Sequence, residues 1–359
     1  MNRKEVHKGR GAVSNPAGRF EHHRSAPVDD GWAPATGDFG EFEESSPETQ
    51  FLPDRTKNLI ATNDSPDIPF SQSINPYKGC EHGCIYCYAR PTHAYLDLSP
   101  GLDFETRIFY KTGVVERLRE ALDHPRYECS TLAMGTNTDP YQPGERRLKI
   151  TRRILETLLE YRHPVSIVTK GAAVLRDLDL LVPLAEQGLA VVMLSVTTLD
   201  NALKNKLEPR TASPGARLRA VRTLHEAGIP VGVMAAPMIP YINDQELERI
   251  VEAAAEAGAR DIRYTMLRLP YEVKDLFREW LREHYPLKAD HVMSRVRDSR
   301  GGKDYDAQWG VRMRGEGAFA DLLAKRYEVA LRKYGLTERG LPTLRTDLFR
   351  PRTEQLGLF

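Results

Sequence analysis

The sequence predicts an α/β protein built around a parallel sheet, in the form of a barrel or partial barrel. Short, continuously apolar runs alternate with amphipathic stretches of helical period from about Pro66 onward. This pattern is typical of parallel strands covered by helices, because both faces of such strands are buried and their residues are therefore continuously apolar. Six β/α units of this kind fit a barrel or partial barrel better than a flat sheet, and periodicity leaves the closure of the barrel open.

The units follow one another in a regular order. Ser71–Asn75 leads into a cysteine-rich loop, and apolar residues from Val114 to Leu122 have the spacing of a helix face. The expected strands then span residues 131–134, 165–169, 190–196, 231–234 and 262–267. The expected helices span residues 150–159, 175–184, 218–226, 247–257 and 276–281.

Three segments are expected along the chain. Residues 1–65 are rich in Gly, Pro, Ser, Asp and Glu and lack periodic apolar positions, so they predict a flexible leader. Residues 66–285 form the predicted core barrel. Residues 286–359 form a C-terminal extension, with a helix over 319–331 and an extended, mobile end over 336–359.

The composition excludes several classes of protein. A net charge of +1 gives no bulk attraction to nucleic acid or to membranes. No apolar run reaches the roughly 18 residues that a membrane-spanning helix needs, and Met1–Glu5 lacks the apolar core of a secretory signal. Together with clustered cysteines, these features predict a reducing cytoplasm, where thiols bind metal rather than pair as disulfides.

Three of the four cysteines lie within eight residues, in a C-x3-C-x2-C pattern with Tyr86 before the last of them. Cys80, Cys84 and Cys87 therefore predict a metal site, because thiolates at this spacing suit soft metals. A structural zinc requires a fourth ligand, for which His82, His93 and Cys129 are candidates. A [4Fe–4S] cluster held by three thiolates keeps one iron open for another ligand.

The cysteine pattern, in a loop after the first strand of a β/α series, resembles that of the radical S-adenosylmethionine (SAM) superfamily. The resemblance covers about residues 66–285. It implies a partial (β/α)6 barrel whose open iron binds SAM. It also implies that a flavodoxin-like or ferredoxin-like reductant supplies the electron that cleaves SAM to a 5′-deoxyadenosyl radical, which abstracts hydrogen from a substrate.

A narrower resemblance rests on three strand ends, where parallel barrels place their sites. Thr136–Glu145, Val168–Lys170 and Ser195–Thr198 resemble the spore photoproduct lyase-related branch, often described as DNA repair photolyases. That branch implies lyase-like chemistry on DNA. It also implies that the SAM contacts come from Tyr86, Thr138, Asp139, Lys170 and Ser195.

One position departs from the pattern of that branch. Spore photoproduct lyases carry a fourth cysteine that returns a hydrogen atom to the repaired thymine, and Thr136 stands at that position here. Cys129 is expected at the opposite end of its strand, too far to replace it. The departure leaves the substrate open between a nucleic acid lesion, a protein and a small molecule.

Several other residues are expected on the substrate side. Leu207–Arg210 and Pro237–Asp244 follow the fourth and fifth strands, and Arg268 ends the sixth, where it suits a phosphate, a carboxylate or a structural salt bridge. The extension mixes aromatic and basic residues, a pattern that suits either nucleic acid or a segment that closes the barrel. These residues are Tyr305, Trp309, Arg312 and Arg314.

The last five residues match a Q-L-x-L-F peptide with which bacterial replication and repair proteins dock on the sliding clamp. An apolar groove would take Leu356, Leu358 and Phe359, with Gln355 fixing the register. Folding of this end onto the barrel is the alternative. A non-catalytic, zinc-binding adaptor that docks on the clamp is the alternative to an enzyme.

Overall fold

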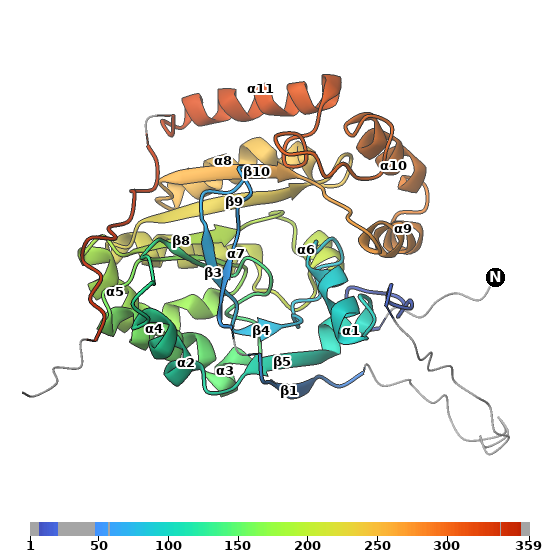
Figure 1. Cartoon of the computed structure of the whole chain (residues 1–359). Helices are drawn as coiled ribbons and strands as arrows, with labels where there is room; N and C mark the ends of the chain where they lie inside the picture. The colour runs from blue at the N-terminus through green and yellow to red at the C-terminus, as the bar shows by residue number, and fades with distance from the viewer. Residues whose placement is uncertain (1–6, 21–46, 57, 338, 353–359) are drawn as a thin grey trace, which may run out of the picture.

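A seven-stranded sheet forms the centre of the computed structural model, which describes residues 7–20, 47–56, 58–337 and 339–352. Its strand order is β10-β9-β8-β7-β6-β3-β2, and all neighbours are parallel except the β2/β3 pair. The strands are β2 (Ile60–Thr62), β3 (Gln72–Ile74), β6 (Leu132–Met134), β7 (Val165–Thr169), β8 (Ala190–Ser195), β9 (Val231–Met238) and β10 (Asp261–Met266). The six parallel strands and their helices form an open, partial (β/α)6 barrel, which confirms the predicted fold class (Figure 1).

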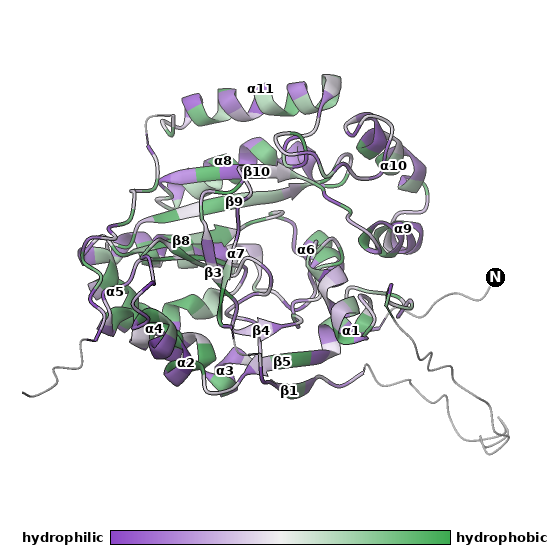
Figure 2. Ribbon diagram, viewed as in Figure 1, coloured by the Kyte–Doolittle hydropathy of each residue, from purple (hydrophilic) through white to green (hydrophobic). Residues whose placement is uncertain are grey.

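Helices cover the outer face of this sheet. They alternate hydrophobic and hydrophilic residues along their turns, as amphipathic helices do (Figure 2). The covering helices are α2 (Val114–Leu122), α4 (Ile150–Glu160), α5 (Leu178–Glu186), α7 (Pro214–Glu226), α8 (Leu247–Glu256) and α11 (Gly317–Lys333). The helix expected over 175–184 begins instead as a short 3-10 turn, η2 (Ala172–Asp177), and continues as α5.

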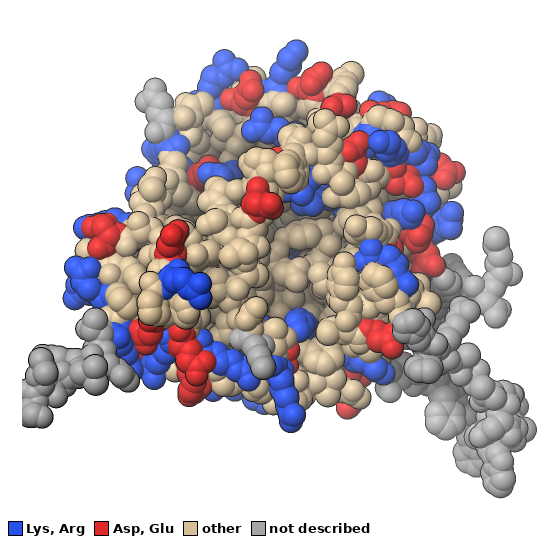
Figure 3. Space-filling model, viewed as in Figure 1, with Lys and Arg blue, Asp and Glu red and all other residues tan. Residues whose placement is uncertain are grey.

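The two faces of the sheet differ in side-chain size at β3, β6 and the start of β7, whereas Val191, Met193 and Met234 lie on the interior face of β8 and β9. Residues that point toward the helices, such as Ile167, Val192 and Val233, are fully buried and belong to one hydrophobic core. The opposite face carries a row of small residues in register, Ser73, Ala133 and Ser166. Because parallel barrels are usually filled by bulky side chains on this face, small residues leave the interior partly hollow. The space-filling view shows this hollow in the middle of the molecule (Figure 3).

A second, three-stranded sheet lies beside the barrel and carries the cysteine loop. Its order is β1 (Gln50–Asp54), β5 (Arg107–Lys111), β4 (Tyr77–Lys78). The sequence analysis did not identify β1 or β5, because neither run is continuously apolar. Shorter elements complete the barrel mouth: η1 (Arg90–Leu96), α1 (Leu102–Thr106), α3 (Glu145–Leu148), α6 (Asn201–Leu207) and η3 (Asp244–Glu246).

The expectation of a flexible leader over residues 1–65 is wrong for the described part of that segment. Arg10, Ala12 and Val13 are buried, and residues 50–54 and 60–62 are strands. Residues 1–6 and 21–46 lie outside the described residues. Polar composition misled the prediction, because this segment is held by backbone and carboxylate hydrogen bonds rather than by periodic apolar contacts.

The C-terminal extension packs along both ends of the barrel. After β10 come α9 (Val273–His284) and α10 (Ala289–Asp298), and residues 304–316, which we call the strap, return to the sheet edge. The strap links the two open edges of the sheet, because Met266 of β10 donates its backbone N–H to Met313 (2.9 Å) while Arg312 pairs with Asp67, between β2 and β3 (2.6 Å). It therefore closes the side of the barrel that the sheet leaves open.

Residues 339–352 are extended, as expected, but they are packed rather than free. Phe349 lies against Tyr127, Tyr161 and His163, and Arg350 donates its backbone N–H to Tyr161 (2.9 Å). These contacts lie at the amino ends of the strands, opposite the cysteine loop (Figure 1). The clamp-like peptide, residues 355–359, lies outside the described residues.

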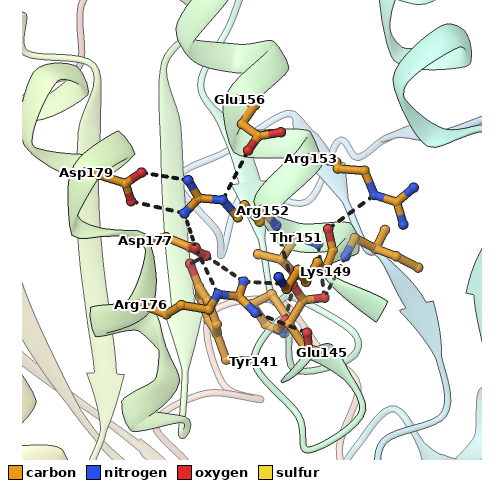
Figure 4. A network of polar contacts seen from close by, with 12 residues as sticks. Tyr141, Glu145, Lys149, Thr151, Arg152, Arg153, Glu156, Arg176, Asp177 and Asp179 are labelled. Carbon is orange, nitrogen blue, oxygen red and sulfur yellow. Dashed lines mark hydrogen bonds and ion pairs between the residues drawn. The ribbon is translucent and has the colours of Figure 1, made fainter. Parts of the chain in front are cut away.

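A polar network around Glu145 links the start of α4 to Arg176 and Asp177 of η2 (Figure 4). Buried Glu145 accepts the hydroxyl of Tyr77, just before the loop, and the backbone N–H groups of Ile150 and Thr151 at the start of α4. It also pairs with Arg176 (2.8 Å). One carboxylate thus caps a helix and fixes the strand that leads into the loop.

No helix among the described residues is both long enough and apolar enough to cross a membrane.

The buried His163 predicts a pH-dependent stability. Burial lowers its pKa to about 4, whereas the unfolded chain keeps a pKa of about 6.5. The unfolded state therefore takes up the proton first as the pH falls, and the free energy of unfolding should decrease between about pH 6.5 and 4 by up to roughly 3 kcal/mol. Urea unfolding at a series of pH values measures this. His163→Gln should flatten the decrease and His124→Gln, at an exposed site, should not; equal slopes in wild type and His163→Gln would contradict the assignment.

Candidate active site

The cysteine loop runs from Gly79 to Tyr88 at the mouth of the barrel. Cys80 and Cys84 are buried free thiols, and Cys87 is half-buried. The loop turns at two glycines with positive φ, Gly79 (φ +81°) and Gly83 (φ +67°). A side chain at Gly79 would also meet His93 and the Arg107 carbonyl, so both positions require glycine.

A fully buried ion pair supports the loop from behind. Arg90 pairs with Glu105, and both side chains are 0% exposed. Arg90 also donates to the carbonyl of Cys84 (2.9 Å). Glu105 also accepts hydrogen bonds from the backbone N–H groups of Gly11 and Ala12 (2.9 Å each). These hydrogen bonds hold the N-terminal segment against the cysteine loop.

The three thiols suit a metal centre that displaces their protons. Burial raises the pKa of Cys84 to about 12, although the nearby Lys170 opposes the increase. Burial also raises the pKa of Cys80, whose sulfur accepts the backbone N–H of Asp139. Thiols of this kind stay protonated until a metal binds. Among the described residues, no group of three His, Cys, Asp or Glu side chains is placed to hold a metal ion.

The candidate fourth ligands of a zinc site have different surroundings. His82 Nδ1 lies 3.3 Å from the Asp139 carboxylate. His93 is buried against Phe104, and its Nε2 lies 3.0 Å from the Arg107 carbonyl. Cys129 lies beside Tyr127, before β6, as the sequence analysis expected. A contact at one ring nitrogen leaves the other able to bind a metal, so metal analysis decides between a cluster and zinc.

A second buried ion pair lies on the opposite side of the loop. Arg217 at the start of α7 pairs with Glu208 (2.8 Å), and both side chains are 0% exposed. Glu208 accepts the hydroxyl of Tyr86 (2.5 Å), the aromatic residue of the cysteine motif. Burial opposes ionisation of Glu208, but the charges of Arg217 and Lys170 outweigh it and hold the pKa of the carboxyl below its ordinary value.

Lys170 and Ser195 lie where a cofactor could reach them. They follow or end neighbouring strands β7 and β8, on the interior face of the sheet. The Lys170 ammonium lies 5.7 Å from the centre of the Tyr86 ring, and no described residue accepts a hydrogen bond from it. The neighbouring Cys84 and Glu208 raise its pKa, although burial alone would lower it. Lys170 is thus a charged, unpaired cation beside the thiols.

Thr138 and Asp139 mainly brace the loop. The Thr138 hydroxyl donates to the Tyr77 carbonyl (2.9 Å). The Asp139 carboxylate accepts from Tyr141 N, Thr169 Oγ1 and Lys170 N, and it also contacts His82. These partners occupy about four acceptor positions, which is the capacity of a carboxylate. The SAM contacts expected of Thr138 and Asp139 stay predictions, and for Asp139 the filled positions argue against a direct contact.

Polar residues near the mouth of the barrel have two kinds of surroundings. Asn243, in the segment 237–244, is buried and bonded to the carbonyls of Thr197 and Pro237, so it fixes the mouth rather than a ligand. Thr136 and Tyr88, by contrast, line the interior: the Tyr88 hydroxyl donates to the Thr136 carbonyl, and Tyr88 is 46% exposed. The signal for Glu208 was its place in a strand-end loop, whereas nothing local marked Arg217, Arg90 or Glu105.

Comparison with known proteins places the chain among radical enzymes. The profile of the radical SAM superfamily matches residues 74–254. An uncharacterized protein of Mycobacterium tuberculosis is 38% identical over 233 residues, which span 64% of this chain and 67% of that protein. An uncharacterized protein of Methanocaldococcus jannaschii is 31% identical over 173 residues, or 48% of this chain and 62% of that protein.

Solved structures of spore photoproduct lyase have the same fold. One variant superposes with a TM-score of 0.54 and 16% identity over 84% of this chain and 85% of that chain. The lyase complexed with a dinucleoside spore photoproduct superposes with a TM-score of 0.51 and 17% identity over 79% and 78%. At these identities the likeness concerns the fold.

The contact between the N-terminal segment and the loop predicts a variant with a loosened metal site. A methyl group at Gly11 would overlap the carbonyl oxygen of Gly83. We expect Gly11→Ala to release iron to a chelator roughly tenfold faster than wild type, because residues behind a metal site usually change its affinity by that order. Iron release is followed by absorbance, and the melting temperature of the metal-free protein reports on folding.

The matched control is Gly340→Ala, where an added methyl meets nothing within 4 Å. Equal iron release from both variants and wild type would show that the N-terminal segment does not support the loop.

Proposed function

Since the profile match covers half of the chain, the protein belongs to the radical SAM superfamily, and we propose that it binds a [4Fe–4S] cluster through Cys80, Cys84 and Cys87 and acts on a nucleic acid lesion. The observation that carries the proposal is the placement of three free thiols in one loop beside an unpaired cation, Lys170, at one end of a hollow barrel. Radical SAM enzymes need a reductant, and a flavodoxin-like or ferredoxin-like protein is the proposed donor.

The bound cluster and SAM would supply a 5′-deoxyadenosyl radical that takes hydrogen from the substrate. The residues of the chain hold and orient these groups. Lys170 offers its ammonium to the SAM carboxylate, and Ser195 offers a hydroxyl from the next strand. Tyr86 places its ring beside Lys170, with its hydroxyl fixed on Glu208. Asp139 positions the loop through His82 and Cys80.

A nucleic acid substrate is supported by the fold and by the mouth of the barrel. The structural relatives include a lyase solved with a dinucleoside photoproduct. Tyr88 and Trp309 expose flat rings near the mouth and on the strap, at 46% and 55%, and such rings stack on bases. Thr136 still offers no thiol for hydrogen return, so the reaction need not be the splitting of that photoproduct. Protein and small-molecule substrates remain the second candidate class.

The proposed clamp partner would attach far from this site. Arg352, the last described residue, donates its backbone N–H to Asp123 (2.8 Å) at the amino-end face of the barrel. The docking prediction concerns Gln355, Leu356, Leu358 and Phe359, which follow it. A partner held there would leave the mouth accessible.

Anaerobic reconstitution tests the proposed chemistry. We expect about four irons and four sulfides per chain, and formation of 5′-deoxyadenosine when dithionite and SAM are added. Replacing any of Cys80, Cys84 or Cys87 by Ser should abolish both, because each thiolate holds one iron. Cys129→Ser is the control and should retain both. One zinc per chain without sulfide would refute the enzyme and support the adaptor.

Lys170→Met tests the SAM site separately from the cluster. Loss of a charge-assisted hydrogen bond should raise the KM for SAM by about tenfold or more, while the visible absorption of the cluster is retained. Lys333→Met, on the exposed face of α11, provides the control. A KM equal to that of wild type would remove Lys170 from the SAM site.

A further inference from the structure

Arg268 stands out because its charge has no acidic partner among the residues that the structure describes. It lies two residues after β10, at the carboxyl end of the strand, where parallel barrels place their ligands. Its Nε is buried without a hydrogen-bond partner. Its Nη1 reaches only the sulfur of Met313, at 3.5 Å, which is a weak acceptor. The structural salt bridge that the sequence allowed for Arg268 is therefore not formed with any described residue.

Neighbouring arginines are, in contrast, satisfied by the protein. Arg300 is buried and donates to the carbonyls of Val311 (2.8 Å) and Leu267 (2.9 Å). Arg312 pairs with Asp67 at 2.6 Å, and the same carboxylate accepts the backbone N–H of Gly310. Burial opposes ionisation of Asp67, but the contacts with Gly310 and Arg312 and the charge of Arg268 together lower the pKa of this carboxyl. Arg268 itself makes no hydrogen bond to Asp67. Of these three arginines, Arg268 alone has no oxygen acceptor among the described residues.

An enclosed guanidinium without a counter-ion is costly, because it has lost part of its hydration and gained no acceptor. The usual compensation is an anionic ligand, and the planar, forked guanidinium matches phosphate oxygens in pairs. The lack of a partner at Arg268 therefore points to a ligand.

The position of Arg268 relates this ligand to the cysteine loop. Its guanidinium lies 5.0 Å from the centre of the Tyr88 ring, and Tyr88 directly follows Cys87. An anion on Arg268 would hold the remainder of its molecule at the mouth of the hollow, beside the proposed cluster.

We propose that Arg268 binds a phosphate group of the substrate and so fixes the substrate at the mouth of the barrel. This inference rests on the proposed action on nucleic acid, and it identifies Arg268 as the residue that positions the nucleic acid. The exposed rings of Tyr88 and Trp309 favour a nucleotide as the bearer of this phosphate. Arg268 is a binding residue, distinct from Lys170, which serves the SAM carboxylate.

Binding of a fluorescein-labelled, single-stranded oligodeoxynucleotide to the reconstituted holoprotein tests the proposal. We expect Arg268→Gln to weaken binding by about tenfold or more, the usual loss for a charge-assisted hydrogen bond. The slope of log affinity against log salt should decrease by about 0.7, the value for one phosphate contact on a single strand. Arg268→Lys should restore part of the affinity, because the charge returns without the fork.

Two further ligands separate the sources of the phosphate. Thymidine monophosphate measures a free mononucleotide, and an oligonucleotide with an uncharged methylphosphonate backbone measures binding without phosphate charge. Wild type and Arg268→Gln should bind the uncharged strand equally. A loss for the mononucleotide alone would assign the phosphate to a small molecule.

Arg260→Gln is the matched control, because Arg260 is an exposed arginine just before the amino end of the same strand. It should bind the oligonucleotide like wild type. The proposal is overturned if Arg268→Gln binds every phosphate ligand like wild type, or if it weakens only SAM. If wild type binds neither phosphate ligand, the proposed phosphate site is refuted. The proposed radical chemistry is tested separately by the formation of 5′-deoxyadenosine.

Discussion

Two fully buried ion pairs hold the cysteine loop from opposite sides, and the site depends on them. Arg90–Glu105 lies behind the loop, and Arg217–Glu208 lies across it under Tyr86. A buried pair contributes little net stability, but removing one partner leaves an uncompensated charge and is strongly destabilising. Such pairs therefore fix one arrangement of the loop rather than strengthen the fold. Three thiols, of which Cys80 and Cys84 are buried, must meet one metal centre and so need a loop that is already in place.

The repeating elements could be predicted because their signal is local. Apolar runs such as 190–195 and helical faces such as 150–160 carry their period within one window of sequence. The elements that were missed or misjudged depend on distant partners. Gly11 and Ala12 are held by Glu105, more than 90 residues away, and the strap is held by Asp67. No local sequence pattern in either segment predicts a hydrogen-bond or ion-pair partner so far away along the chain.

The candidate site divides in the same way. The cysteine spacing marked the three thiols, and the strand-end positions of Lys170 and Ser195 followed from the order of the strands. For Asp139 the type and place of the residue suggested a cofactor contact, whereas its carboxylate is used by the protein itself. Arg268 shows the opposite case, since only the structure reveals that its charge lacks an acidic partner. Sequence can place a side chain at the mouth, but satisfaction of its hydrogen bonds depends on the assembled surroundings.

Because of the small residues on the inner face of the sheet, the contacts that stabilise the fold and the space open to a substrate involve different side chains. The apolar contacts that hold the fold lie on the outer face, between strands and helices, whereas Ser73, Ala133 and Ser166 border the hollow. An exchange of one of these small residues for a larger one would alter the volume available to a substrate and leave the helical layer untouched. The barrel can therefore diverge toward bulkier or smaller substrates through single inner-wall substitutions, with its radical-forming end unchanged.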